Sequence, residues 1–243
     1  MTAGAPDTGR PSPAPSGPFG RVLAVMDFDG TATTADCMPL VLGRFLDDWR
    51  GMYTAARAEG LSQVAAVGRG LASLRATQEE VVAAFVEVSV LRPGLAGFVA
   101  RVLGDGGEAA VVSAGVREAI EAVLRGGGVP AIPVYAGELM GDPARGYSLD
   151  LKGFGDCPLC GPGFCKGPVV RALRRPGQTV VAFGDGARDL CMAREADLVF
   201  ARGALLGLCE QEGLQVRELT DFDDASVQLA VWLDGCGSPA DGG

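Results

Sequence analysis

Short apolar runs that are typical of buried strands alternate with stretches of helical periodicity. The predicted strands are RVLAVMDFD (21–29), EAAVVSA (108–114), AIPVYAGEL (131–139), TVVAFGD (179–185) and LVFAR (198–202). Strands that alternate with helices along a chain form a parallel sheet with helices on both faces. The sequence therefore predicts an α/β fold built on a Rossmann-like, doubly wound parallel sheet.

One long interruption separates the first predicted strand from the others. Residues 36–91 read as successive helices without a convincing strand, and Thr77 with Glu80 three residues later forms a capping box for the third. We expect an α/β core of residues 21–35 and 92–234, with a helical insert at 36–91. Residues 1–20, rich in Pro, Gly, Ala and Ser, are expected to form a disordered tail, and residues 235–243 a flexible one.

Composition limits the partners. Lys plus Arg is 21 against 30 for Asp plus Glu, a net charge of -9, which disfavours nucleic acid and anionic membranes because both need a basic face. No stretch reaches the ~20 apolar residues of a transmembrane helix, and the N-terminus lacks the pattern of a secretory signal. We expect a cytoplasmic protein, monomeric or homodimeric, without a nucleic-acid or membrane partner.

The sequence contains no histidine and seven cysteines. The missing histidine removes Ser-His-Asp and Cys-His catalysis and His-ligated zinc. An odd number of cysteines in a large domain is not typical of a disulfide framework. Catalysis is left to carboxylates, lysine, hydroxyl groups, thiols or a bound metal.

Polar residues follow three of the predicted strands where each ends. Asp27 and Asp29 end the first, Ser113 the second and Asp185 the fourth, and Lys166 begins the helix before that fourth strand. Ligands of open parallel sheets bind beyond the carboxyl ends of the strands, so these side chains are expected to meet at one edge. Buried carboxylates are unfavourable unless something offsets their charge.

Three aspartates with one lysine and one serine fit a magnesium and phosphate site. Mg²⁺ prefers oxygen ligands, so Asp27 and Asp185 are its natural side-chain ligands, and the ion offsets their charge. Lys166 and Ser113 can hold phosphate oxygens while a carboxylate attacks phosphorus. Asp29, expected on the other face of the strand but near the same opening, can serve as general acid and base.

The motifs DFDGT (27–31), VVSAG (111–115), Lys166 and GDGARD (184–189) resemble, in order, those of the haloacid dehalogenase superfamily. This resemblance implies a Mg²⁺-dependent phosphomonoester hydrolase with Asp27 as nucleophile and Asp29 as acid and base. It also implies Mg²⁺ held by Asp27, Asp29 (through its carbonyl) and Asp185, and support from Asp189. The implied phosphate-binding residues are Thr31, Ser113, Ala114, Gly115 and Lys166. The helical insert resembles the family's cap domain, which closes over a small phosphorylated metabolite.

A finer resemblance lies in CPLCGPGFCKGPVV (157–170) and ADLVFARGALLGLCEQEG (196–213). Both are similar to the phosphoserine-phosphatase-like branch, in particular to methionine-salvage phosphatases, which act on 2-hydroxy-3-keto-5-methylthiopentenyl-1-phosphate. Phosphoserine and phosphoethanolamine or phosphocholine phosphatases are the alternatives. Asp36 matches a region where phosphoserine phosphatases meet the substrate amine, although it can equally cap the first insert helix.

Other interpretations remain open for several of these residues. The Asp27–Asp29 pair could be a strand-end turn, Lys166 a solvated lysine with Lys152 in its place, and Asp189 a carboxylate in a helix first turn. A receiver-like phospho-acceptor domain and an inactive binder of a phosphorylated ligand are the rival functions. Asp29 and the long insert argue against the receiver, and the intact motifs argue against the inactive binder.

Cys157, Cys160 and Cys165 lie just before Lys166. A structural zinc site needs four ligands, so Asp156 or another cysteine would have to complete it. An ordinary loop and a redox-active pair are the other two readings. The spacing alone does not choose among them.

Overall fold

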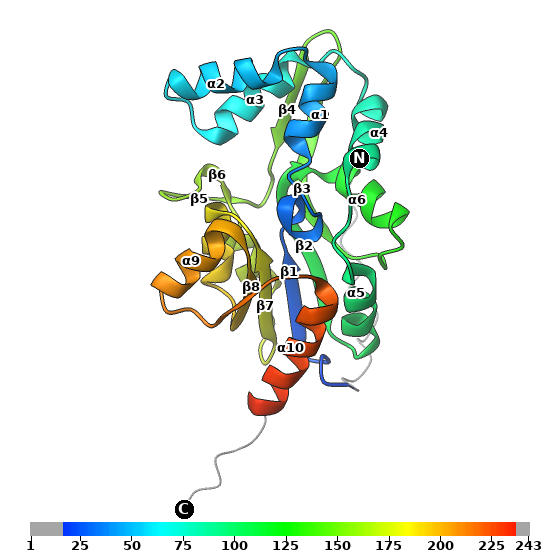
Figure 1. Cartoon of the computed structure of the whole chain (residues 1–243), viewed down its shortest axis with the longest axis vertical. Coiled ribbons are helices and arrows are strands. Elements are labelled where there is room, and N and C mark those ends of the chain that lie inside the picture. The colour runs from blue at the N-terminus through cyan, green and yellow to red at the C-terminus, as the bar shows by residue number, and fades with distance from the viewer. Residues whose placement is uncertain (1–16, 237–243) are drawn as a thin grey trace, which may run out of the picture.

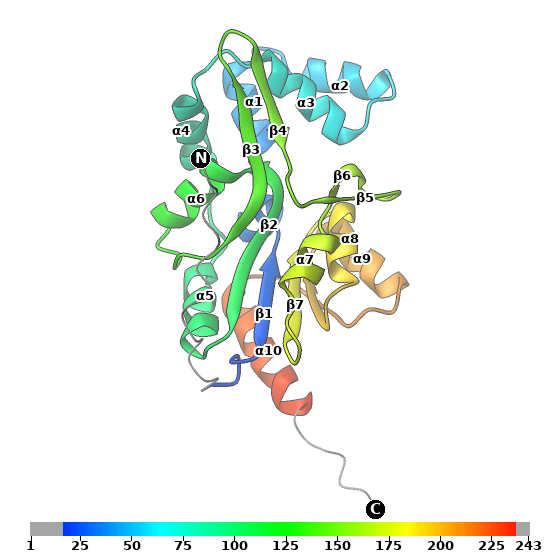
Figure 2. The same cartoon turned by 180° about the vertical axis from the view of Figure 1, so that it is seen from behind.

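The structure, a computed structural model, describes residues 17–236 (Figures 1 and 2). A seven-stranded sheet has the order β4-β3-β2-β1-β7-β8-β9, in which every neighbouring pair is parallel except the antiparallel pair β3 and β4. Its strands are β1 (Val22–Met26), β2 (Glu108–Val116), β3 (Val134–Asp142), β4 (Gly146–Asp150), β7 (Thr179–Gly184), β8 (Leu198–Ala201) and β9 (Val216–Glu218). The predicted doubly wound α/β fold is confirmed.

Strand β1 lies at the centre of the sheet and is buried on both faces. Its alternate residues enter two separate apolar clusters. Val22, Ala24 and Met26 pack with α5 (Leu95–Gly104), α6 (Arg117–Gly126) and α10 (Phe222–Cys236). Leu23 and Val25 pack with α7 (Gly167–Leu173), α8 (Leu190–Ala193) and α9 (Gly203–Gln211). The continuous apolar run of β1 is thus explained by helices on both faces.

The chain reverses its winding direction at β1. From β1 it moves outward through β2 and β3, and it then returns to the other side of β1 as β7, with Met26 in register with Phe183. The carboxyl ends of β1 and β7 are therefore neighbours at a topological switch point. Such a point opens a crevice in which ligands of parallel sheets bind.

The predicted helical insert contains α1 (Met38–Phe45), α2 (Trp49–Ala58), α3 (Gln63–Ser73) and α4 (Gln78–Val88). Side chains of Asp48, Ser62 and Thr77 cap the last three of these helices, and the capping box of Thr77 and Glu80 is confirmed. The described residues between 34 and 90 contain no strand. Each of these N-caps starts a new helix locally, so the insert is divided into short helices.

The hairpin of β3 and β4 extends beyond the rest of the sheet to reach the insert (Figure 2). Tyr147 of β4 donates a hydrogen bond from its hydroxyl to the carbonyl of Ala76, at 2.9 Å. Gly146 has φ +82°, and a Cβ there would lie 1.9 Å from the carbonyl oxygen of Ala72. The insert thus rests on an edge of the core through a backbone approach that only glycine allows.

A second, two-stranded sheet was not predicted. It consists of β5 (Gly155–Cys157) and β6 (Gly161–Cys165), and it lies between the insert helices and α9 (Figure 1). Glycine and proline in CPLCGPGFC hid this ribbon, because both are depleted in strands. Strand β9, only three residues long, was also missed.

The two predicted tails lie mostly outside the described residues. Residues 1–16 and 237–243 lie outside the described residues, but residues 17–20 form a turn in which Phe19 is fully buried and its ring centroid lies 6.2 Å from that of Phe98. Helix α10 likewise continues to Cys236. Residues 17–20 are therefore ordered by the packing of the Phe19 side chain on the core, so the predicted N-terminal tail was too long by these four residues. Within the described residues, no helix has the length and apolarity to cross a membrane.

Candidate active site

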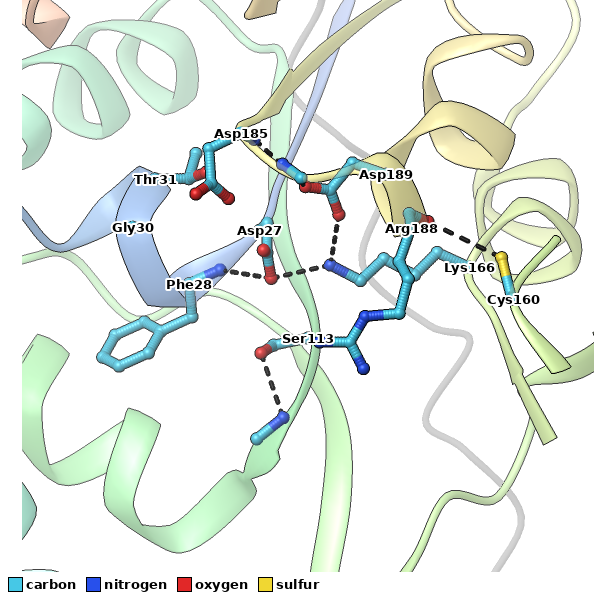
Figure 3. A network of polar contacts seen from close by, with 12 residues as sticks. Asp27, Phe28, Gly30, Thr31, Ser113, Cys160, Lys166, Asp185, Arg188 and Asp189 are labelled. Atoms are coloured by element: carbon cyan, nitrogen blue, oxygen red, sulfur yellow. Dashed lines mark hydrogen bonds and ion pairs between the residues drawn. The ribbon is translucent and has the colours of Figure 1, made fainter. Parts of the chain in front are cut away.

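Asp27 directly follows β1 and is 9% exposed. Its backbone N–H donates to the carbonyl of Phe183 in β7, so it continues the sheet by one residue. Its Oδ1 accepts from the N–H of Phe28 at 2.7 Å and from Lys166 Nζ at 2.7 Å (Figure 3). The carboxylate is therefore held at the switch point by one backbone donor and one cation.

Lys166 joins two carboxylates. It precedes α7, is 3% exposed, and places Nζ 2.7 Å from Asp27 Oδ1 and 2.6 Å from Asp189 Oδ1. Burial alone would lower the pKa of Lys166, but the negative charges of Asp189 and Asp27 outweigh it and raise that pKa. Lys166 is thus a buried cation, and the alternative reading of a solvated lysine is wrong.

The pKa of Asp27 is raised to about 7. Burial is the largest cause, the charge of Asp189 adds to it, and the charge of Lys166 opposes it. A carboxylate in this position titrates close to neutral pH unless a further cation is present. One more positive charge beside Asp27 would therefore lower this pKa and stabilise the carboxylate.

Asp185 and Asp189 come from the end of β7 and the short turn Ala187–Asp189. Asp189 Oδ2 accepts from the N–H groups of Asp185 and Gly186, both at 3.0 Å, while its Oδ1 binds Lys166. Asp185 Oδ1 accepts from the hydroxyl of Thr31 at 3.3 Å. Both oxygens of Asp189 are engaged, whereas Asp185 keeps one oxygen for a ligand.

The carboxylates of Asp27, Asp185 and Asp189 form a cluster whose ligand atoms lie within 4.8 Å of one another. In the described part of the chain, no donor contacts Oδ2 of Asp27 or of Asp185. A Cβ on Gly30 would lie 2.5 Å from that Asp185 oxygen, so the glycine leaves space beside it. Two open carboxylate oxygens beside the space that Gly30 leaves fit Mg²⁺, which takes one or two carboxylates and completes its octahedron with water and substrate.

Asp29 lies in the turn Phe28–Ala32 and not on the far face of a strand, because β1 ends at Met26. Its Oδ1 accepts from the N–H of Cys37 at 2.9 Å. Burial and the charge of Asp36 raise its pKa to about 6. Asp29 can therefore exchange a proton near neutral pH, as an acid and base must.

Ser113, Ala114 and Gly115 lie where the register between β2 and β3 shifts. The N–H of Gly115 donates to Ser113 Oγ at 3.1 Å, and all three residues line the cavity described below. Thr31 is different, because it is buried with its hydroxyl on Asp185 and does not line that cavity. We therefore assign Thr31 to the carboxylate cluster instead of to direct phosphate contact.

Two arginines that the sequence reasoning missed fix the turn after β1. Arg92 is 7% exposed and donates to the carbonyls of Gly30 (2.8 Å), Thr31 (2.8 Å) and Thr33 (3.1 Å). Arg202 donates to the carbonyl of Gly30 at 3.2 Å. These partners are carbonyls distant in sequence, so no local pattern could have revealed them.

A cavity of about 820 Å³ opens above these residues, between core and insert. Asp27, Asp29, Lys166 and Asp185 lie on its core side. The insert contributes Asp36, Met38, Pro39, Trp49, Arg50, Tyr53, Thr54, Gln63, Val64, Ala65, Val67, Gly68 and Leu71. Arg188, which the sequence reasoning did not single out, also lines it.

The surroundings of Lys152 and Asp36 bear on two of the alternative interpretations. Lys152 pairs with Glu138 at 3.6 Å and Asp150 at 3.3 Å and is exposed, so it does not replace Lys166. Asp36 accepts from the N–H of Met38 at 3.2 Å, at the start of α1, and it also lines the cavity. Both readings of Asp36, helix start and substrate contact, are therefore compatible with its position.

The sequence that carries this site matches a known protein family. Residues 24–194, more than half of the chain, match the sequence model of the haloacid dehalogenase-like hydrolases. This chain belongs to that family. The match contains Asp27, Ser113, Lys166 and Asp185, the residues that the structure gathers at the switch point. The predicted superfamily is confirmed for this haloacid dehalogenase-like hydrolase.

Similar proteins include curated relatives and solved structures. The 2-hydroxy-3-keto-5-methylthiopentenyl-1-phosphate phosphatase of an Exiguobacterium species is 29% identical over 211 residues, covering 84% of this chain and 95% of the relative. The enzyme of that name from Geobacillus thermodenitrificans is 30% identical over 218 residues, with 86% and 96% covered. A phosphoserine phosphatase in its apo form superimposes with a TM-score of 0.62 at 17% identity, covering 85% of this chain and 97% of its own, which shows a shared fold.

Proposed function

We propose that this hydrolase is a Mg²⁺-dependent phosphomonoesterase that works through an aspartyl-phosphate on Asp27. The observation that carries the proposal is the pairing of Asp27 with Lys166 at 2.7 Å, on the floor of a cavity that Asp29 and Asp185 also line. A nucleophilic carboxylate beside a cation and a titratable carboxyl group is the set that phosphoryl transfer to a side chain requires.

In the first step, one oxygen of Asp27 attacks phosphorus and the bond from phosphorus to the ester oxygen breaks. Asp29 donates its proton to the leaving oxygen, which departs as an alcohol or enol. Its pKa of about 6, raised by burial and by Asp36, keeps part of the population protonated near neutral pH. Lys166 and Ser113 hold the phosphoryl oxygens as charge develops on them.

In the second step, Asp29, now a carboxylate, takes a proton from water as that water attacks phosphorus. The bond between phosphorus and Asp27 breaks, and inorganic phosphate is released. Mg²⁺, when bound by Asp27 and Asp185, supplies positive charge that screens the phosphate from the attacking carboxylate. Asp189 keeps Lys166 in place throughout, at 2.6 Å.

The proposed substrate is the methionine-salvage enol phosphate, 2-hydroxy-3-keto-5-methylthiopentenyl-1-phosphate. Support comes from the relatives of that name, which this chain matches over nearly their whole length. The part of the cavity wall that the insert contributes also supports this substrate. It has an apolar side that suits a methylthio tail, formed by Met38, Trp49, Tyr53 and Leu71. Asp36 in the same wall favours the second candidates, amine-bearing phosphates such as phosphoserine, phosphoethanolamine and phosphocholine.

A panel of substrates tests both the proposed reaction and the proposed substrate. We expect kcat/KM to be highest for the enol phosphate and lower for phosphoserine, phosphoethanolamine and phosphocholine. A flat profile would reject the specialised substrate and leave a general phosphatase. Absence of turnover of p-nitrophenyl phosphate with any divalent metal would reject the enzyme and favour a receiver-like switch or a binder of phosphorylated ligands.

We further propose a cytoplasmic location and a monomer or homodimer. The location is supported by the six cysteines whose side chains the structure describes, none of which forms a disulfide, since a reducing compartment preserves such groups. Fractionation of cells and the mass of the purified protein in solution test the two statements.

A further inference from the structure

Four cysteines converge outside the catalytic cluster, on the side of the core that carries the β5–β6 ribbon. Cys157 ends β5, Cys160 lies in the turn, Cys165 ends β6 and Cys191 belongs to α8. Their sulfur atoms all lie within 4.8 Å of one another. Cys191 supplies a fourth thiol, which the sequence spacing left open, so Asp156 is not needed to make a set of four.

The distances suit a bound tetrahedral metal. The Sγ atoms of Cys157 and Cys191 are 3.6 Å apart, and those of Cys160 and Cys191 are 3.7 Å apart. Zn–S bonds of about 2.3 Å in a tetrahedron separate the sulfurs by about 3.8 Å. A disulfide would bring one pair to about 2.05 Å and leave the other two thiols without a role.

The surroundings also favour a metal. The N–H of Cys160 donates to Cys157 Sγ at 3.1 Å, which stabilises a thiolate. Cys160 and Cys165 are buried, and Cys157 and Cys191 are partly buried, so little solvent reaches the centre of the cluster. A two-stranded ribbon alone is marginally stable. Leu159 at its turn is 45% exposed, so this side chain does not anchor the ribbon in an apolar core, and a bound metal would stabilise it instead.

We propose that Cys157, Cys160, Cys165 and Cys191 bind one structural Zn²⁺ that fastens the β5–β6 ribbon to α8. On binding, the thiols coordinate as thiolates and release their protons to solvent. Four protein ligands leave no open position, so the ion is structural and takes no part in the hydrolysis.

The zinc site adjoins the catalytic residues on both sides. Cys165 immediately precedes Lys166, and Cys191 lies two residues after Asp189, while Lys166 and Asp189 contact each other at 2.6 Å. Cys160 Sγ also lies 3.7 Å from the carbonyl oxygen of Arg188, which lines the cavity (Figure 3), and the thiol-to-carbonyl hydrogen bond there would be given up when the thiolate binds zinc. The bound ion would therefore hold together the two segments that carry this ion pair.

Metal content tests the proposal without any substrate, so its failure is distinct from failure of the proposed phosphatase. The full chain, purified without a histidine tag and dialysed against EDTA, is expected to retain about one zinc per chain by mass spectrometry of the elements. X-ray absorption at the zinc edge is expected to show four sulfur neighbours at about 2.3 Å. Metal-free protein with four reactive thiols, a disulfide within the cluster, or iron in place of zinc would overturn it.

Variants sharpen the assignment. Cys157→Ser combined with Cys191→Ser is expected to lose the zinc, because two ligands from different elements are removed. The matched control is Cys37→Ser combined with Cys209→Ser, two buried cysteines outside the cluster, which is expected to retain it. Retention of stoichiometric zinc by the first pair would contradict the proposal. If that pair does not fold, the absorption spectrum of the wild-type protein still decides.

Discussion

At the scale of single residues, Asp27 is the group on which the site depends. Its carboxylate is buried, lies 2.7 Å from Lys166, and has a pKa raised to about 7 by burial and by the charge of Asp189. Burial at this position makes the charge of Asp27 unfavourable. The same position places the carboxylate where the central strands β1 and β7 end. This residue therefore carries the sharpest predictions.

Replacing Asp27 by asparagine keeps the shape of the side chain and removes the attacking oxygen anion. We expect kcat to fall by at least about a thousand-fold, as for loss of other nucleophiles. Steady-state turnover of p-nitrophenyl phosphate measures it, with circular dichroism to verify folding. The control Asp48→Asn lies at the exposed start of α2 and is expected to leave kcat unchanged. Near-normal kcat in Asp27→Asn would exclude Asp27 as the nucleophile.

The raised pKa of Asp27 predicts that Mg²⁺ affinity depends on pH. Protons and the metal compete for the same carboxylate, so a pKa of about 7 makes the apparent Kd for Mg²⁺ about tenfold weaker at pH 6 than at pH 8. Isothermal titration at the two pH values measures the ratio. Asp29→Asn is expected to retain this dependence, because that carboxyl group is not in the metal cluster. Equal affinity at both pH values would show that Asp27 is ionised throughout.

At the scale of elements, the turn Phe28–Ala32 depends on Arg92. The turn leaves carbonyls pointing inward at Gly30, Thr31 and Thr33, and one guanidinium satisfies all three. A buried carbonyl without a donor is unfavourable by about 1–3 kcal/mol. The position of Asp29 within this turn is thus secured by a residue that never reaches the cavity.

Arg92→Met is expected to reduce the free energy of unfolding by about 3 kcal/mol or more, because three buried acceptors lose a charged donor. Chemical denaturation measures the change. Arg175→Met is the matched control, since Arg175 pairs with Glu108 on the surface and such pairs contribute about 0–1 kcal/mol. Similar losses in the two variants would mean that the three carbonyls find other donors.

Element by element, periodicity and composition predicted what depends on local sequence. The central strands, the insert helices and the capping box at Thr77 follow from apolar spacing and side-chain caps. The β5–β6 ribbon was missed because glycine and proline mask a strand that long-range contacts stabilise. Asp29 was wrongly placed on the other face of the first strand, since residues two apart on a strand share a face and β1 already stops at Met26.

The residues of the candidate site that were predicted also differ from those that were missed in how local their sequence signal is. Asp27, Ser113, Lys166 and Asp185 were predicted because each follows or precedes an element whose end the sequence marks, and the structure brings them to one cavity. Arg92 and Cys191 were not, because their partners lie in segments far away along the chain. Such pairings depend on tertiary packing and leave no local pattern.

At the scale of the whole molecule, the insert and the core meet at the tip of the β3–β4 hairpin. Gly146→Ala is expected to lower stability by about 2–3 kcal/mol, since it combines a left-handed φ with a Cβ 1.9 Å from the Ala72 carbonyl oxygen. Gly163→Ala, with φ +73° and no atom within 4 Å, controls for the backbone term and is expected to lower it by about 1 kcal/mol. Thermal denaturation compares the two variants. Equal losses of stability would show that the hairpin tip shifts away from Ala72 and accommodates the added Cβ.

The winding reversal at β1 also has a consequence for how the chain acquires activity. Thr31 and Asp185, in contact in the folded protein, are separated by 154 positions along the chain, and β1 gains its second neighbour only when β7 arrives. Contacts between segments so distant form late, because closing a long loop is entropically unfavourable. A nascent chain that has emerged only as far as β3 would carry Asp27, the proposed nucleophile, without Asp185, the second proposed Mg²⁺ ligand. The proposed activity therefore requires β7 to be in place, and a chain that ends before Thr179 is expected to hydrolyse no phosphate ester.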